Sequence, residues 1–108
     1  MNTSIISAGG GAQLSHLNPQ QVAQIRQFAE ANHVRVTLVG SRATGTASVI
    51  SDFDYLIQGV NSRVRSLARS QLPRGLRSLE NGGTDLWNEA NFPLDTSRAH
   101  IIFDARLP

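Results

Sequence analysis

The chain has 108 residues, a length that suits one small domain with a limited core. With 40% hydrophobic and 17% charged residues it has an ordinary globular composition, and a net charge of +2 is too small to indicate a nucleic-acid partner by itself. The absence of Cys excludes a disulfide framework and a thiolate metal site. No apolar run is long enough to cross a membrane, and the first residues do not have the pattern of a signal peptide.

The first half of the chain predicts a helix followed by a strand. Residues 1–14 are small, polar and Gly-rich, so we expect a flexible lead-in. Asn18-Pro19 is typical of a helix start, and apolar residues at helical spacing predict a helix over residues 19–31. The β-branched residues 34–39 predict a central strand. A Gly-Ser turn ends it, and residues 42–48 form either a short helix or a loop.

The second half predicts one further helix and three strands. Residues 53–58 are a strand, and residues 61–71 are a helix capped by Asn61. A loop over residues 76–83 leads to short strands at residues 84–87 and 100–103. This order predicts an α+β domain over residues 15–108, in which α/β elements form two layers and a small mixed sheet carries its helices on one side.

Asp52 and Asp54 are the most informative residues of the chain. In a strand, residues i and i+2 point to the same face with Cα atoms roughly 6–7 Å apart. Two carboxylates on one face are costly to bury without a cation, and their oxygens suit Mg²⁺, which proteins often bind through one or two carboxylates plus substrate phosphates. Gly40-Ser41, just upstream, offers backbone N–H groups for those phosphates. The pattern predicts metal-assisted chemistry on a nucleotide, on the strand face opposite Phe53, Tyr55 and Ile57.

Two segments carry a resemblance to a known family. Residues 38–47, LVGSRATGTA, and residues 51–57, SDFDYLI, resemble the nucleotidyltransferase superfamily with the polymerase-β-type fold. The Gly-Ser-Arg-Ala-x-Gly-x-Ala form is similar to the minimal nucleotidyltransferases. Residues 83–87 and 93–103 look like the closing segment of nucleotidyltransferase domains at the C-termini of bacterial polymorphic toxins, which are delivered as parts of secreted or surface proteins.

The resemblance implies roles for the residues of the two motifs. Gly40 and Ser41 would hold the triphosphate of the nucleotide, with Ser51 as a further nucleotide-binding residue. Arg42 would contact phosphate or, equally, cover the surface. Asp52 and Asp54 would bind one or two Mg²⁺ ions.

The family also has a third carboxylate on a later strand, which binds metal or deprotonates the attacking hydroxyl. We assign this metal-binding and catalytic role to Asp85, which begins a strand after the intervening helix. Asp104 and Asp95 are the alternatives.

Other polar and aromatic residues keep two interpretations. Arg63, Arg65 and Arg69 form either an exposed helix face or a track for RNA or triphosphate. His100 is expected to be structural rather than catalytic, and Trp87 is expected in the core rather than stacked on a base.

The predicted function is Mg²⁺-dependent transfer of an NMP group from an NTP to a hydroxyl of RNA, such as tRNA, or of protein. We expect a toxin effector acting in the cytoplasm, with an immunity protein as partner. The alternatives are an antitoxin that modifies a partner toxin, and a non-catalytic module that binds nucleotide or RNA. The sequence identifies neither the NTP, nor the acceptor, nor the oligomeric state.

Overall fold

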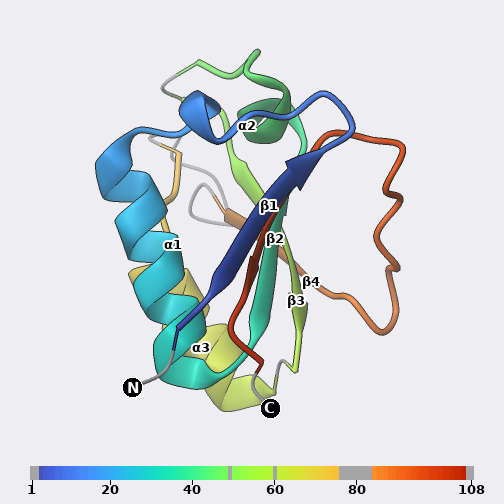
Figure 1. Ribbon diagram of the computed structural model, residues 1–108. Coiled ribbons are helices and arrows are strands. Elements are labelled where there is room, and N and C mark those ends of the chain that lie inside the picture. Colours follow the sequence, from blue (N-terminus) through green and yellow to red (C-terminus); the bar gives the residue numbers. More distant parts are fainter. Residues whose placement is uncertain (1–2, 49, 60, 76–83, 107–108) are drawn as a thin grey trace.

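The computed structural model describes residues 3–48, 50–59, 61–75 and 84–106. A mixed sheet forms one layer and helices form the other, which confirms the predicted α+β class (Figure 1). The elements in chain order are β1 (Ile5–Gly9), the short 3-10 helix η1 (Leu14–His16), α1 (Pro19–Asn32), β2 (Arg35–Val39), α2 (Ser41–Thr44), β3 (Phe53–Gln58), α3 (Ser62–Gln71), β4 (Thr84–Asn88) and β5 (His100–Asp104).

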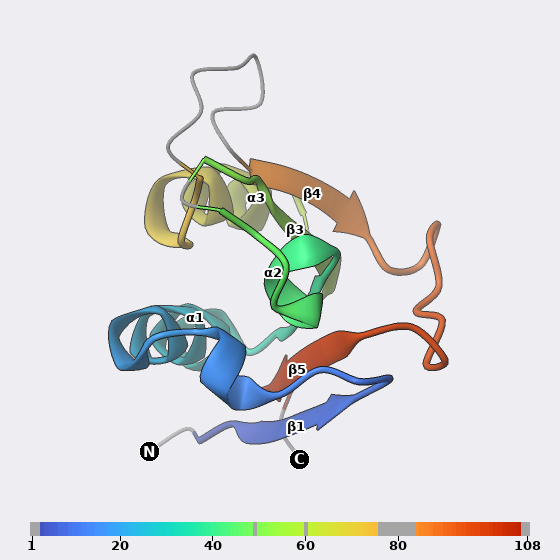
Figure 2. The same cartoon turned by 90° about the horizontal axis from the view of Figure 1, so that it is seen from above.

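The strands lie in the order β1-β5-β2-β3-β4, so β2 is central, as predicted. β3 and β4 are parallel, whereas the other neighbouring strands are antiparallel. Helices α1 and α3 cover one face, and the segment between β4 and β5 runs on the opposite side of the sheet (Figure 2). The sheet therefore has a helix face and a second face that the segment between β4 and β5 approaches.

The core lies between the sheet and the helices. Phe53, Tyr55 and Ile57 of β3 are buried on the helix face, as their alternation with Asp54 and Leu56 predicted. The Tyr55 hydroxyl donates a hydrogen bond to the carbonyl of Pro73 at 2.6 Å, which ties the end of the α3 segment to the sheet. The even-numbered residues of β3 thereby face the other side.

Both predicted helix caps are confirmed. The Asn18 side chain accepts a hydrogen bond from the Gln21 N–H at 2.8 Å, and Asn61 accepts one from the Val64 N–H at 2.9 Å. These bonds satisfy N–H groups that have no partner inside a helix. Of the two options for residues 42–48, the structure has a short helix, α2, which begins at Ser41.

The flexible lead-in predicted for residues 1–14 is wrong in part, because these residues contain β1. β1 pairs with β5 from Ile5 opposite Asp104 to Gly9 opposite His100. The glycines at and after the end of β1 allow close packing. A Cβ on Gly9 would lie 2.8 Å from the His100 ring, and one on Gly10 would lie 2.0 Å from the Arg98 carbonyl oxygen. The Gly-rich composition therefore reflects close backbone approach as well as turning. The loop predicted at residues 76–83 lies outside the described residues.

Candidate active site

The predicted carboxylates meet at one end of the second sheet face. Asp54 of β3 is the direct register partner of Asp85 of β4. Neighbouring strands lie about 4.8 Å apart, so these two side chains stand beside each other on the same face. Asp52 precedes β3 by one residue, and its charge acts on Asp54. The fold thus brings together Asp54 and Asp85, which are 31 positions apart in the sequence, and Asp52 is near enough for its charge to act on Asp54.

The protonation of Asp54 reflects this crowding. Burial raises the pKa of Asp54 to about 6, and a side-chain hydrogen bond with Asp85 and the charges of Asp85 and Asp52 act in the same direction. A hydrogen bond between two carboxyl groups requires a proton on one of them. A proton or a cation between the two carboxyl groups would therefore relieve their repulsion.

The Gly-Ser turn lies directly against this pair. Val39 is the register partner of Asp54, and Gly40 follows it with φ 75° and ψ −157°, a conformation that is essentially restricted to glycine. A Cβ on Gly40 would lie 2.5 Å from Oδ2 of Asp54. Because α2 begins at Ser41, the N–H groups of Ser41 and Arg42 are the ones that a first helical turn leaves without a partner inside the helix. The turn thus brings N–H donors close to the Asp54 carboxylate.

Arg42 and Ser51 hold the turn region together. A terminal nitrogen of Arg42 donates to the Ser51 carbonyl at 2.9 Å, and the guanidinium lies over the Phe53 ring, 4.2 Å from its centroid. Burial lowers the pKa of Arg42. The Ser51 hydroxyl accepts a hydrogen bond from the Ser48 N–H at 3.0 Å. These contacts support the segment that presents Asp52 and Asp54, and a nucleotide contact by Arg42 or Ser51 stays a prediction.

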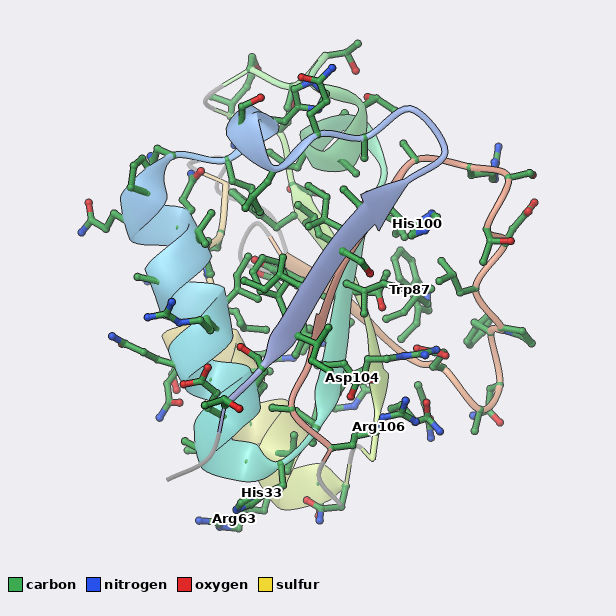
Figure 3. All side chains as sticks on the ribbon, viewed as in Figure 1. His33, Arg63, Trp87, His100, Asp104 and Arg106 are labelled. Carbon is green, nitrogen blue, oxygen red and sulfur yellow. The ribbon has the colours of Figure 1, made fainter. Side chains whose placement is uncertain are left out.

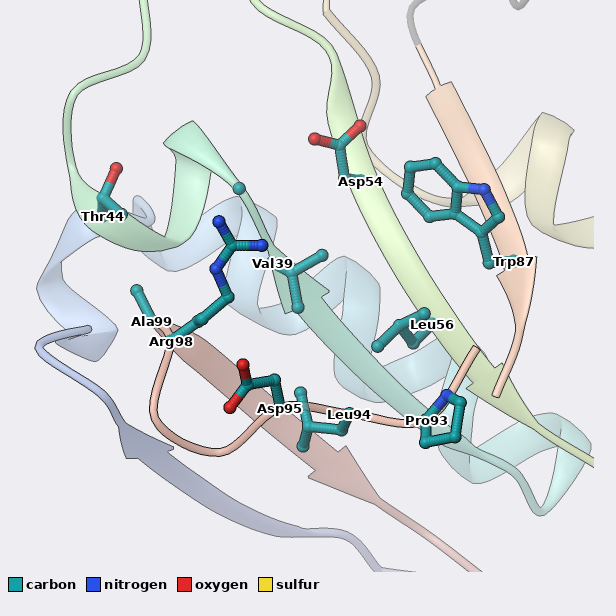
Figure 4. Close-up of a pocket in the computed structure, with 11 residues that line it drawn as sticks. Val39, Thr44, Asp54, Leu56, Trp87, Pro93, Leu94, Asp95, Arg98 and Ala99 are labelled. Atoms are coloured by element: carbon teal, nitrogen blue, oxygen red, sulfur yellow. The ribbon is translucent and has the colours of Figure 1, made fainter. Parts of the chain in front are cut away.

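A cavity of about 400 Å³ opens beside Asp54 (Figure 4). Its volume lies in the range of small-molecule sites. The β2–α2 junction, β3, β4 and the segment before β5 all contribute to its wall. The lining residues are Val39, Gly40, Thr44, Asp54, Leu56, Trp87, Pro93, Leu94, Asp95, Arg98 and Ala99.

Several lining residues differ from the sequence interpretation. Trp87 was expected in the core, but it is half-buried on the second face of the sheet and lines the cavity. Leu94 and Arg98 were not selected, although they lie in the segment that resembled the toxin domains. Only the fold-back of residues 89–99 over the sheet places them there, and local sequence patterns do not encode that path.

Asp104 and Asp95, the alternatives for the third carboxylate, do not adjoin Asp54. Asp104 is the register partner of Arg35, which lies four residues, about 13 Å, along β2 from Val39, the register partner of Asp54. β5 and β3 lie on opposite sides of β2, so Asp104 is still farther from Asp54. Asp104 forms an ion pair with Arg106 at 2.7 Å. Asp95 lines the cavity, but its Oδ1 accepts hydrogen bonds from the Ser97 N–H and hydroxyl, at 3.0 and 2.6 Å. Of the three candidates, only Asp85 adjoins Asp54.

The remaining interpretations can be compared with the structure. His100 is buried, and its Nδ1 lies 2.7 Å from the Arg98 carbonyl oxygen, consistent with a structural role (Figure 3). Arg63, Arg65 and Arg69 belong to α3, on the helix face, so they lie on the opposite side of the sheet from the cavity. A nitrogen of Arg65 donates to the Leu86 carbonyl at 3.2 Å, which joins α3 to β4.

Over the described part of the chain, no group of three His, Asp or Glu side chains is arranged to hold a metal ion by itself. No helix within the same ranges has the length and apolar character needed to span a membrane. Comparisons with protein-family models, curated protein sequences and solved structures gave no match.

Proposed function

We propose that this protein is a Mg²⁺-dependent nucleotidyltransferase that moves an NMP group from an NTP to a hydroxyl. The observation that carries the proposal is the pairing of Asp54 with Asp85, against Gly40 and at the wall of a cavity of nucleotide-compatible size. Paired carboxylates, a backbone turn with N–H donors and an adjacent cavity are the parts that phosphoryl chemistry requires.

Magnesium fits the residues that are present. Asp54 and Asp85 offer hard oxygen ligands, and the raised pKa of Asp54 supports the proposal, because a divalent cation would relieve the repulsion between the two carboxylates. Asp52 would be a further ligand. Because Mg²⁺ is commonly held by one or two carboxylates together with substrate phosphates, the absence of a complete three-residue set among the described residues is compatible with one or two ions.

Each group of residues in the site would have its own role in the reaction. The N–H groups and hydroxyl at Gly40-Ser41 would hold the triphosphate. The acceptor oxygen forms a bond to the α-phosphorus, the bond to the bridging oxygen of the β-phosphate breaks, and pyrophosphate leaves with the electron pair. Asp85 would accept the proton of the acceptor hydroxyl. Bound Mg²⁺ would supply Lewis-acid polarisation of the α-phosphate.

The biological setting follows from the family resemblance alone. We propose RNA, such as tRNA, or protein as the acceptor, and a toxin effector with a cytoplasmic target and an immunity protein as partner. An antitoxin role would use the same site on a partner toxin. The gene neighbourhood separates these roles, since an immunity gene is expected downstream of a toxin and a toxin gene beside an antitoxin.

The chemistry is tested by incubating the protein with labelled ATP, CTP, GTP or UTP, Mg²⁺, and tRNA or protein acceptors. We expect label transfer that disappears in EDTA and in an Asp52→Ala/Asp54→Ala double variant. Asp104→Asn is the matched control, because it neutralises a carboxylate at the other end of the same face. Equal labelling by wild type and the double variant would show that the site is not catalytic. Nucleotide binding without transfer to any acceptor would favour the non-catalytic module.

A further inference from the structure

The cavity has two chemically different ends. Trp87 belongs to β4, whereas Arg98 and Ala99 lead into β5, and the sheet order places β2 and β3 between these strands. Asp54 on β3 therefore lies between an apolar end formed with Trp87, Pro93 and Leu56 and a polar end that contains Arg98 (Figure 4). An elongated ligand that has one apolar and one anionic end would match this order.

Arg98 reaches the polar end from a fixed backbone. Its N–H donates to the Asp95 carbonyl at 3.1 Å, and its own carbonyl lies 2.7 Å from Nδ1 of His100. The same carbonyl packs so closely on Gly10 that a Cβ there would lie 2.0 Å away. The backbone of Arg98 is thus held from both sides, while its side chain is exposed. A preorganised backbone reduces the entropy lost when such a side chain binds a ligand.

The side chain of Arg98 extends toward the β2–α2 junction, between Thr44 and Asp54 (Figure 4). Asp95 Oδ1 accepts hydrogen bonds from Ser97, and the ion pairs of the described residues do not include one between Asp95 and Arg98. Hydrogen bonds from Ser97 and then the charge of Arg98 lower the pKa of Asp95, which stays ionised. The guanidinium therefore lies on the cavity side that also carries Gly40.

We infer that Arg98 binds the β- and γ-phosphates of the nucleotide and makes the site selective for nucleoside triphosphates, with the base lying toward Trp87. This inference rests on the proposed function. A polyanionic ligand approaching Asp54 and Asp85 meets like charge, so a cation from the protein is needed at the far end of the phosphate chain. A guanidinium suits that position because its planar fork binds phosphate oxygens in pairs.

Arg42 is less suited to this task. Its guanidinium is engaged by the Ser51 carbonyl and the Phe53 ring, and it does not line the cavity. Arg42, which the motif suggests as a phosphate ligand, thus supports the turn. The cation that faces the cavity comes from a segment 56 positions further along the chain.

Calorimetric titration of the whole chain with Mg²⁺ and each of the four NTPs tests the inference without an acceptor. The best-bound nucleotide is then compared with its diphosphate, monophosphate and nucleoside. Trp87 is the only Trp in the chain, so its fluorescence locates the ligand in this cavity. Arg98→Ala and Arg98→Lys are compared with Arg63→Ala, which removes the same charge from α3 on the opposite side of the sheet.

We expect Arg98→Ala to weaken NTP binding about 10- to 100-fold, as for loss of a charged hydrogen bond. Nucleoside binding should change less than about threefold. Arg98→Lys should keep part of the triphosphate preference, and Arg63→Ala all of it. If Arg98→Ala keeps the wild-type ratio of affinities for NTP and nucleoside, or loses the same affinity for both, the role of Arg98 is overturned while nucleotide binding stays established. If the wild type binds no nucleotide, both the proposed function and this inference are wrong.

Discussion

The carboxylates at the two ends of the second sheet face have pKa values shifted in opposite directions. At one end, Asp104 pairs with Arg106, and the hydrogen bond from Arg106 is the main cause of its lowered pKa. At the other end, Asp54 lies beside Asp85, and its pKa is raised to about 6. Figure 3 shows Asp104 and Arg106 side by side, with Trp87 and His100 above them.

The two ends also differ in the groups that lie beside their carboxylates. Arg35 and Glu89 form a further ion pair beside Asp104, and Arg106 also donates to Gln58 at 2.7 Å. At this end, guanidinium groups therefore lie beside the carboxylates and neutralise their charge. At the other end, the carboxyl groups of Asp54 and Asp85 lie side by side, an arrangement that costs free energy unless a cation or a shared proton is present.

The largest expected effect is on the rate of NMP transfer, which should differ between variants at the two ends. Asp85→Asn should reduce NMP transfer about 10²- to 10³-fold, the usual cost of losing one charged group that acts on the transition state. NMP transfer by Asp104→Asn should stay within about twofold of wild type, because Asp104 lies more than about 13 Å from Asp54. Initial rates at saturating Mg²⁺ and NTP measure both. Similar losses in the two variants would contradict the assignment of Asp85.

The second prediction concerns the turn that supports the acidic end. Gly40→Ala should lower the free energy of unfolding by about 2–3 kcal/mol, because alanine is strained at this backbone conformation and its Cβ would lie 2.5 Å from Asp54 Oδ2. Gly11→Ala is the control, since Gly11 also has positive φ but a Cβ there meets nothing within 4 Å. Urea unfolding measures the difference. Equal costs at both glycines would mean that the contact with Asp54 is readily relieved.

A third prediction uses the raised pKa of Asp54. Protonation of Asp54 contributes stability that is fully present below the unfolded pKa of 3.8 and is lost as pH rises through about 6. In EDTA at pH 8, Asp54→Asn should therefore be more stable than wild type by about 1 kcal/mol, a value reduced for partial exposure to solvent. At pH 4 most of the difference should disappear. Urea unfolding at the two pH values decides this, and a gain that is independent of pH would exclude relief of charge as its cause.

The smallest effect has the opposite pH dependence. The lowered pKa of Asp104 contributes stability that is present above the unfolded value of 3.8 and is lost as pH falls through the folded value. Asp104→Asn should cost about 0.2–1 kcal/mol at pH 7, as for a partly exposed ion pair, and almost nothing near pH 2. The same unfolding series measures it. A loss that persists at low pH would point to packing rather than charge.

Local signals predicted much of the fold and part of the site. Asn18 and Asn61 cap their helices as expected, because cap chemistry depends on a few neighbouring residues. The alternation along residues 53–57 assigned both faces of β3. Asp85 was selected through its place after the intervening helix, and the parallel register with β3 brings it to Asp54.

Two of the features that sequence reasoning missed depend on β5. β1 becomes a strand only because β5 offers an edge to it, so the glycines of residues 9–11 gave a misleading linker signal. Arg98 reaches the cavity because the segment before β5 folds back over the sheet. Such placements arise from pairings between residues far apart in the chain, which the spacing of apolar residues does not reveal.

The position of β5 also has a consequence for how the protein folds. β5 is the last strand in the sequence, yet it lies between β1 and β2 in the sheet. During synthesis, one edge of β2 stays unpaired until residues 100–104 emerge, and pairings such as Ile5 with Asp104 are of the long-range kind that slows folding. An open central edge invites association with other chains. The Arg98 end of the cavity is therefore completed last, after the segments that carry Gly40, Asp54 and Asp85 have been made.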